Sequence, residues 1–253
     1  MNMSFYTAAV GAEQQQTRLD VLGNNIANVN NTGFCAKRPV FTALMYDFMD
    51  GVDGARLPRG SGAYMSSADS NFAAQAMPDT GRAQDYAIEG DGFFALWDPA
   101  TEEYSYTRDG SFVVSMFTVP LEEGEEPELD ADGNEILEKT VWYLSDGDGR
   151  FVLSNEGRLI EVEDQNAQQP VGVFDFVNTN GMQNVGEKRY VPVEKNGEVI
   201  LGTGRVVWQH LQASNVDLAY ELSKLIEAQR SFSYTLKMIQ ASDEIETTVN
   251  GLR

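Results

Sequence analysis

Two stretches at the ends of this chain repeat apolar residues at alternating intervals of three and four. The first consists of Phe5, Ala8, Ala12, Gln15, Leu19, Leu22, Ile26 and Val29. The second consists of Leu218, Leu222, Leu225, Gln229, Phe232, Leu236 and Ile239. This spacing is the heptad pattern of helices that pack side by side, and each seam is interrupted once, by a glutamine. We therefore expect a long α-helix at each end, packed on its counterpart, on other copies of the chain or on the middle of the molecule.

The charge distribution separates these ends from the rest of the chain. The 253 residues carry a net charge of -21, yet residues 1–46 sum to +1 and residues 205–253 to -1. The whole excess of acid therefore lies in residues 47–204, a region that is well solvated and repels nucleic acid and anionic membranes. Nearly neutral ends can approach one another without that repulsion.

The middle of the chain has the composition of short β-strands separated by turns. Runs such as "YAIEGDGFFALW", "YSYTRDGSFVVS" and "PVGVFDFVN" are rich in β-branched and aromatic residues and are separated by Asp-Gly and Asn-Glu-Gly turns. We predict an α+β protein in four parts. These are an N-terminal helical assembly segment (1–34), an extended connector (35–79), a central, mainly antiparallel β domain (80–204) and a C-terminal helical assembly segment (205–253).

An acidic insert at 121–135, "LEEGEEPELDADGNE", contains no basic residue. A calcium loop of the EF-hand type starting at Asp130 would need glycine at its sixth position and glutamate at its twelfth. Those positions hold Glu135 and Val141. We therefore expect a solvated hairpin tip and no metal site.

The sequence contains few of the residues and motifs that catalysis or cofactor binding requires. A single histidine, His210, and a single cysteine, Cys35, exclude a His-based zinc site, a Ser-His-Asp triad and a disulfide framework. We expect His210 to pack or cap and Cys35 to be a semi-buried thiol. Each Gly-x-Gly motif lacks the third glycine of a dinucleotide-binding loop. No run approaches the length of a membrane helix, and the N-terminus does not have the pattern of a Sec signal peptide. We expect no enzymatic activity and no cofactor.

The segment "LGNNIANVNNTGF" marks the end of the first seam. Asparagine side chains satisfy terminal backbone groups, and Gly33 can adopt the left-handed conformation that turns the chain. We expect the N-terminal helix to stop with its seam at Val29. For the C-terminal helix we expect Ser214 or Asn215 to be the N-cap.

Four blocks in this order resemble the bacterial flagellar axial family, the rod and hook proteins of the basal body. They are "LDVLGNNIANVNNTGF", "KRPVFTALMYDFM", "AIEGDGFFAL" with "YTRDGSF", and "LQASNVDLAYELSKLIEAQRSFSYTLKMIQASDE". Length and the "KRPVF" segment are most similar to those of the distal or proximal rod members. Two features depart from that pattern, a connector after Tyr46 that is short for a distal rod member and the acidic insert, so the paralogue stays open.

The resemblance implies an inner coiled-coil layer of terminal helices with a β domain outside. It also implies export by the flagellar type III apparatus, contacts with other rod and hook proteins, and helical self-assembly into the axial drive shaft that carries torque from motor to hook. We expect no nucleic-acid partner and no membrane insertion. Two alternatives remain, a hook-type axial protein and a secreted acidic β protein that binds a cation or glycan and is oligomerised by its terminal helices. The residues expected at the assembly interface are Leu19, Leu22, Asn24, Asn25, Ile26, Asn28, Val29, Gly33, Phe34, Leu218, Leu222, Leu225, Phe232, Leu236 and Ile239.

Overall fold

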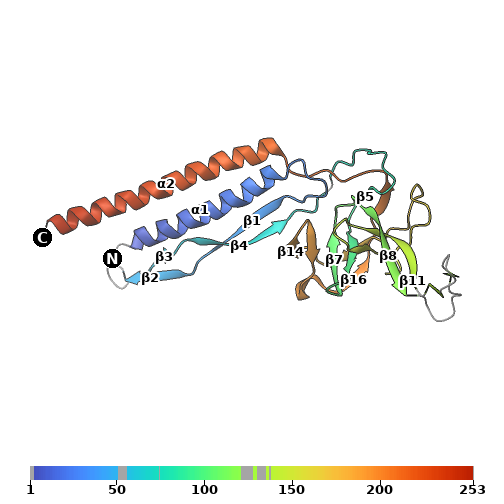
Figure 1. Cartoon of the computed structure of the whole chain (residues 1–253). Helices are drawn as coiled ribbons and strands as arrows, with labels where there is room; N and C mark the ends of the chain where they lie inside the picture. Colours follow the sequence, from blue (N-terminus) through green and yellow to red (C-terminus); the bar gives the residue numbers. More distant parts are fainter. Residues whose placement is uncertain are drawn as a thin grey trace. The chain divides into compact units, whose positions relative to one another are not determined.

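A computed structural model describes residues 3–50, 56–73, 75–120, 128–129, 135–136 and 138–252 (Figure 1). The chain divides into two compact units. The helical unit comprises residues 1–30, 35–71 and 216–253, and the β unit comprises residues 31–34 and 72–215. The fold class is α+β, with an N-terminal and a C-terminal helix around a central antiparallel β domain.

The helical unit contains two long helices, α1 (Met3–Ala27) and α2 (Leu218–Gly251), in the part of the chain that is described. They lie side by side and antiparallel, because Gly11 faces Thr235 while Arg18 contacts Glu227 (Figure 1). At a rise of 1.5 Å per residue the 34 residues of α2 extend about 50 Å and the 25 of α1 only about 38 Å. The last turns of α2 therefore run past the start of α1.

Both helix ends differ slightly from the sequence prediction. α1 ends at Ala27, two residues before the seam does, and Val29 closes a turn by donating its N–H to the carbonyl of Ile26. The N-cap of α2 is Asp217, which replaces the expected Ser214 or Asn215. Its carboxylate accepts the N–H groups of Ala219 and Tyr220 at 2.9 and 3.1 Å. An aspartate at this position also complements the positive end of the helix dipole.

The segment expected to be an extended connector forms paired strands. β1 (Lys37–Ala43) pairs with β4 (Ala63–Ser70), and β2 (Tyr46–Asp50) pairs with β3 (Arg56–Gly60), both antiparallel. The register of the first pair shifts between Val40 and Phe41. β4 runs along α1, where the backbone N–H of Met65 donates to the side-chain oxygen of Gln14 at 2.7 Å. Sequence alternation was too weak here to predict pairing, because the segment has many Gly, Ser and Asp residues among its apolar ones.

The β unit is built on one antiparallel sheet, of seven strands among the described residues, in the order β14-β15-β7-β6-β12-β11-β8. Their bounds are β6 (Phe94–Asp98), β7 (Glu103–Thr107), β8 (Val113–Pro120), β11 (Glu138–Ser145), β12 (Phe151–Val152), β14 (Gln183–Gly186) and β15 (Arg189–Val191). Two further pairs are β5 (Tyr86–Glu89) with β17 (Arg205–Trp208) and β13 (Phe174–Phe176) with β16 (Val199–Leu201). A short 3-10 helix, η2 (Glu194–Asn196), precedes β16.

The core of the β unit is continuous and closed. Its buried side chains are Tyr86, Ile88, Phe94, Leu96, Phe112, Leu144, Val152, Ile160, Val162, Val171 and Val173, none of which exposes more than 5% of its surface. They come from sequence positions up to 87 residues apart, so the core forms only when distant strands pair. Residues 205–215 also belong to this unit and contain β17, whereas the sequence suggested that the C-terminal segment begins at residue 205.

Most of the acidic insert lies outside the described residues. Within it, β9 (Glu128–Leu129) pairs with β10 (Glu135–Ile136). The expectation of a solvated hairpin tip concerns residues that are otherwise not described, and it stays a prediction.

Candidate assembly interface

The residues that α2 buries are small or polar. Along α2, one heptad position holds Glu221, Ala228, Thr235 and Ser242, of which the first, second and fourth are buried. Opposite them, Gly11 would place a Cβ 3.5 Å from Thr235, an ordinary contact distance. Small residues at a heptad position let two helices approach closely, but they bury little apolar area. The intramolecular seam is therefore narrow.

The apolar seam predicted for α2 faces elsewhere. Leu218, Leu222 and Leu236 are exposed, whereas Leu225, Phe232 and Ile239 are half-buried. The residues that α2 buries are displaced from the predicted seam by about a fifth of a turn on average. We call the exposed row, together with Leu225 and Phe232, the leucine stripe of α2.

A second exposed row occupies the C-terminal half of α2. Tyr234, Met238, Ile245, Val249 and Leu252 follow the same three-four rhythm, and all are exposed. Ile245 and Val249 border a hollow of about 370 Å³ together with Ala241, Glu244 and Thr248. A helix that is apolar on several sides normally lies in a protein interior. α2 thus carries apolar surface that the single chain does not cover.

The predicted residues of α1 fall into two groups. Leu22 is buried, and Leu19 and Ile26 are half-buried, as expected of a seam that the chain itself covers. Asn25 is completely buried: its side-chain amide donates to the carbonyl of Lys37 at 2.8 Å and its oxygen accepts the N–H of Lys37 at 2.9 Å. This reciprocal pair fixes the start of β1 against α1.

The other asparagines lie at the surface of the helix end. The Asn28 amide donates to the carbonyl of Asn24 at 2.8 Å, which satisfies one of the last acceptors of α1. Asn24 is exposed, and Val29 is half-buried. Asn28 is half-buried, so Asn24 is the most exposed of the three predicted asparagines.

Gly33 and Phe34 belong to the β unit. Gly33 has the left-handed conformation expected for it, with φ 65°, and donates its N–H to the carbonyl of Gln212 at 2.7 Å. A Cβ at Gly33 would come within 2.5 Å of the backbone of Asp109. Phe34 is buried. Both residues therefore have a structural role inside the β unit, where their burial leaves little surface for contacts with another subunit.

Comparisons with known proteins identify the same two ends of the chain. The family described as flagella basal body rod protein matches residues 5–34, and the one described as flagellar basal body rod FlgEFG protein C-terminal matches residues 209–252. The flagellar basal-body rod protein FlgG of Bacillus subtilis is 31% identical over 266 residues, which cover 97% of each chain. FlgG of Borreliella burgdorferi is 28% identical over 273 residues, with 100% of this chain and 99% of the relative covered. The rod protein FlgF of Caulobacter vibrioides is 27% identical over 245 residues, 93% of each chain.

The chain belongs to the flagellar basal-body rod protein family. It is a structural subunit of the rod, in the basal body of the flagellum, a family that assembles with other rod and hook proteins. The identification agrees with the apolar surface that the single chain leaves exposed on α2. Membership of this family argues against the alternative of a secreted cation-binding or glycan-binding protein.

As a rod protein, the chain is a member of a structural family that is not known for catalysis. No cluster of three or more metal-ligating side chains occurs among the residues that the structure describes. Cys35 is fully buried rather than semi-buried, and the Nδ1–H of His210 donates to the carbonyl of Trp208 at 2.8 Å. Neither of the two described helices has a stretch apolar and long enough to cross a bilayer.

Several ion pairs of the β unit converge on Arg150. Arg150 contacts Asp146 and Glu187 at 2.7 Å each, and Asp148 at 3.2 Å. The hydrogen bond and charge of Arg150 lower the pKa of the Glu187 carboxyl from its ordinary value. These groups join the loop after β11 to the turn before β15, which indicates a structural role.

Proposed function

We propose that this rod protein polymerises helically with copies of itself, that α1 and α2 form the inner coiled-coil layer, and that the polymer carries torque from motor to hook. The observation that supports the proposal is the row of exposed apolar side chains on α2. Covering one exposed leucine contributes up to about 1.5–3 kcal/mol, so several per subunit suffice for stable association. Each subunit would use both the leucine stripe and the second exposed row of α2. A surface that joins copies in two directions generates a closed or helical assembly.

Torque transmission follows from that geometry. A subunit held by neighbours along two faces of a 34-residue helix cannot rotate independently of them. The β unit adds rigidity through its closed core, and its net charge of -18, from 27 acidic and nine basic residues, keeps the outer surface solvated.

We further propose that the subunits reach the growing rod through the flagellar type III export apparatus. The narrow α1–α2 seam supports this, because a helical unit with few buried apolar side chains opens at little cost before transport. In a strain that lacks the export gate, the chain should stay in the cytosol at normal abundance. Its arrival outside the cytoplasmic membrane in that strain would contradict the proposal.

The polymer itself is tested with purified full-length chain. Electron micrographs and sedimentation above a threshold concentration should show rods of variable length, because helical growth has no fixed end. A ring or oligomer of one fixed size at all concentrations would contradict helical assembly and leave only closed oligomerisation.

A further inference from the structure

The chain contains three asparagines that are each followed by glycine, in the pairs Asn180–Gly181, Asn196–Gly197 and Asn250–Gly251. This dipeptide is prone to lose the side-chain amide of the asparagine, because a glycine without Cβ leaves its own backbone nitrogen open to attack the side-chain carbon Cγ before it. The local chemistry is the same in all three pairs. The fold therefore decides which of them reacts.

The pair Asn196–Gly197 is held by hydrogen bonds at both reacting groups. Asn196 is fully buried, and its side-chain oxygen accepts the N–H of Val193 at 2.7 Å. Its side-chain amide donates to the carbonyls of Asn178 and Asn180 at 2.6 and 3.2 Å. The glycine of this pair donates its N–H to the carbonyl of Glu194 at 3.4 Å. The two reacting groups are therefore fixed away from each other.

The pair Asn250–Gly251 lies in the last turn of α2. A backbone N–H in an α-helix donates to the carbonyl one turn earlier, which occupies the attacking nitrogen. Gly251 is the last residue of α2, and the carbonyl of Asn250 accepts the N–H of Leu252. Terminal turns fray, so this pair should react slowly.

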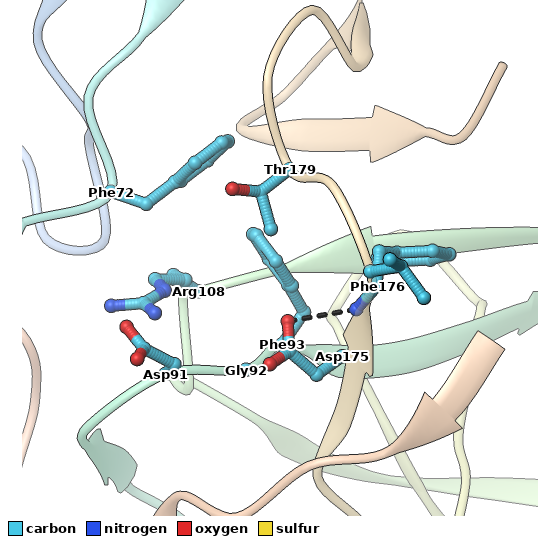
Figure 2. A pocket seen from close by; sticks show the side chains of 9 residues that line it. Phe72, Asp91, Gly92, Phe93, Arg108, Asp175, Phe176 and Thr179 are labelled. Carbon is cyan, nitrogen blue, oxygen red and sulfur yellow. Dashed lines mark hydrogen bonds between the residues drawn. The ribbon is translucent and has the colours of Figure 1, made fainter. Parts of the chain in front are cut away.

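The pair Asn180–Gly181 has neither restraint. It follows β13 in a turn where Asn180 is exposed, next to Thr179, which lines a hollow of about 250 Å³ (Figure 2). Among the described residues, no hydrogen bond holds the side-chain amide of Asn180 or the N–H of Gly181. Gly181 has a left-handed conformation, with φ 71°. The carbon that is attacked and the nitrogen that attacks it are both available.

The side chain of Lys195 lies against this pair. A Cβ at Gly181 would collide with the Nζ of Lys195, so the ammonium group lies directly beside the glycine. A positive charge favours removal of the proton from the glycine nitrogen. It also stabilises the oxyanion that forms when this nitrogen adds to Cγ. The fold thus brings a promoting group to the pair that it leaves unprotected.

We propose that Asn180–Gly181 is a site of spontaneous modification by water, in which the ammonium of Lys195 promotes loss of the side-chain amide. The backbone nitrogen of Gly181 loses its proton to solvent hydroxide and bonds to Cγ of Asn180. The Cγ–Nδ2 bond breaks, and ammonia leaves after taking a proton from water. Water then opens the resulting cyclic imide at either carbonyl and gives aspartate or isoaspartate. One water is consumed and one ammonia released, without an oxidant or cofactor.

The modification changes the turn after β13. Either product adds a negative charge beside Lys195. Isoaspartate also lengthens the backbone at residue 180, whose carbonyl accepts the amide of Asn196 at 3.2 Å. The hydrogen bonds between this turn and η2 are therefore the contacts that the modification disturbs.

The test incubates the purified full-length chain in mildly alkaline water labelled with heavy oxygen, which enters each carboxyl that forms. Digestion and tandem mass spectrometry then locate the labelled residues. Asn180 should be converted at least roughly tenfold faster than Asn196, with Asn250 between them, because the reaction needs the two groups to reach each other. No conversion of Asn180, a rate at Asn196 equal to that at Asn180, or a faster rate at Asn250 would each overturn the proposal.

Denaturation provides the control for the fold. In denaturant the three rates should converge to within about threefold, since the protection comes from local structure. A difference that persists there would show that neighbouring residues in the sequence set the rates, and it would also overturn the proposal.

Substitutions at Lys195 test the promoting group. Lys195→Gln removes the charge and should lower the rate at Asn180 by roughly threefold, whereas Lys195→Arg should keep the rate close to that of the parent chain. Arg158→Gln, which removes an exposed positive charge on another turn, is the matched control and should leave the rate unchanged. Circular dichroism verifies that each variant is folded. A rate that is the same in Lys195→Gln and in the parent chain would overturn the role of Lys195 and with it the proposal.

Discussion

The two units of this rod protein treat apolar side chains in opposite ways. The β unit encloses eleven large or branched side chains in one core, each exposed by at most 5%. In α2, the buried residues are Glu221, Ala228 and Ser242, while leucines, tyrosines and a methionine lie on the surface. The comparison indicates that the β unit buries its own core, and it supports the proposal that other subunits cover the apolar surface of α2.

The largest expected effect is the loss of rods in Leu222→Asp, a change in the leucine stripe. A carboxylate buried between helices costs several kcal/mol, and each subunit repeats that cost at every contact. Because Leu222 is exposed in the single chain, the free energy of unfolding of the monomer should change by less than about 0.5 kcal/mol.

The control for this change is the neighbouring Ser223→Asp. It adds the same charge to the same turn, on a side of α2 that carries Arg230 and Lys237 instead of leucines. Basal bodies and swimming should be normal with Ser223→Asp and absent with Leu222→Asp, in cells that lack the unmodified copy. Rods from both variants would mean that the leucine stripe is not an interface.

In the β unit, Phe94→Ala should lower the free energy of unfolding by about 3–5 kcal/mol, because its ring is fully buried in the core. Ile226→Ala in α2, where the side chain is half exposed, should cost less than about 1 kcal/mol. Chemical denaturation of the dilute monomer, followed by tryptophan fluorescence and circular dichroism, measures both. Equal losses at the two sites would remove the contrast between the units.

Gly33→Ala tests the turn after α1 at an intermediate scale. The new methyl group would meet the backbone of Asp109 at 2.5 Å in a left-handed conformation, at a cost of about 2–3 kcal/mol. Gly157→Ala, also left-handed at φ 74° but with open space around it, isolates the conformational part, about 1–2 kcal/mol. Thermal melting of the β unit should rank the two in that order, and a reversed order would show that Asp109 yields easily.

The smallest effect concerns pH. Arg150 lowers the pKa of Glu187 below 4.5, its ordinary value, so the ionised carboxylate stabilises the folded state above the pKa of the unfolded chain. That stabilisation is lost as pH falls through the lower, folded pKa. The carboxyl is 57% exposed, so solvent screens the interaction and the effect is modest.

The measurement compares melting temperatures of the parent chain and Arg150→Gln from about pH 6 to pH 3. The difference between the two should be largest at the upper end and shrink on acidification. A difference that is constant over this range would mean that Glu187 contributes nothing through Arg150.

Local patterns in the sequence predicted where helices and turns lie better than they predicted which faces pack against each other. Heptad spacing located both helices, and Gly33 was assigned its left-handed conformation correctly, because both depend on residues close in the chain. The same spacing did not reveal that Glu221, Ala228, Thr235 and Ser242 form the intramolecular face of α2. These small or polar residues recur every seven positions, and that repeat was visible in the sequence. The leucines nevertheless gave the stronger signal.

Long-range pairing was beyond such patterns. The order of the seven strands joins segments far apart in the chain, and β5 pairs with β17 across more than 100 residues. Register between distant strands is decided by the shared core rather than by any turn in the sequence. The exposure of Val199, Ile200 and Leu201 was equally hidden, since "VIL" has the composition of a buried strand.

The most direct test of the central claim compares two methionines. Met238 in α2 and Met116 in the β unit are equally exposed in the single chain, at 58% and 59%. In the dilute monomer, hydrogen peroxide should therefore oxidise both at similar rates. In assembled rods, oxidation of Met238 should slow by at least roughly tenfold while that of Met116 stays close to its monomer rate, because an interface excludes water and oxidant from the residues it buries. If Met238 in rods reacts as fast as in the monomer, other subunits do not cover α2, and the account is contradicted.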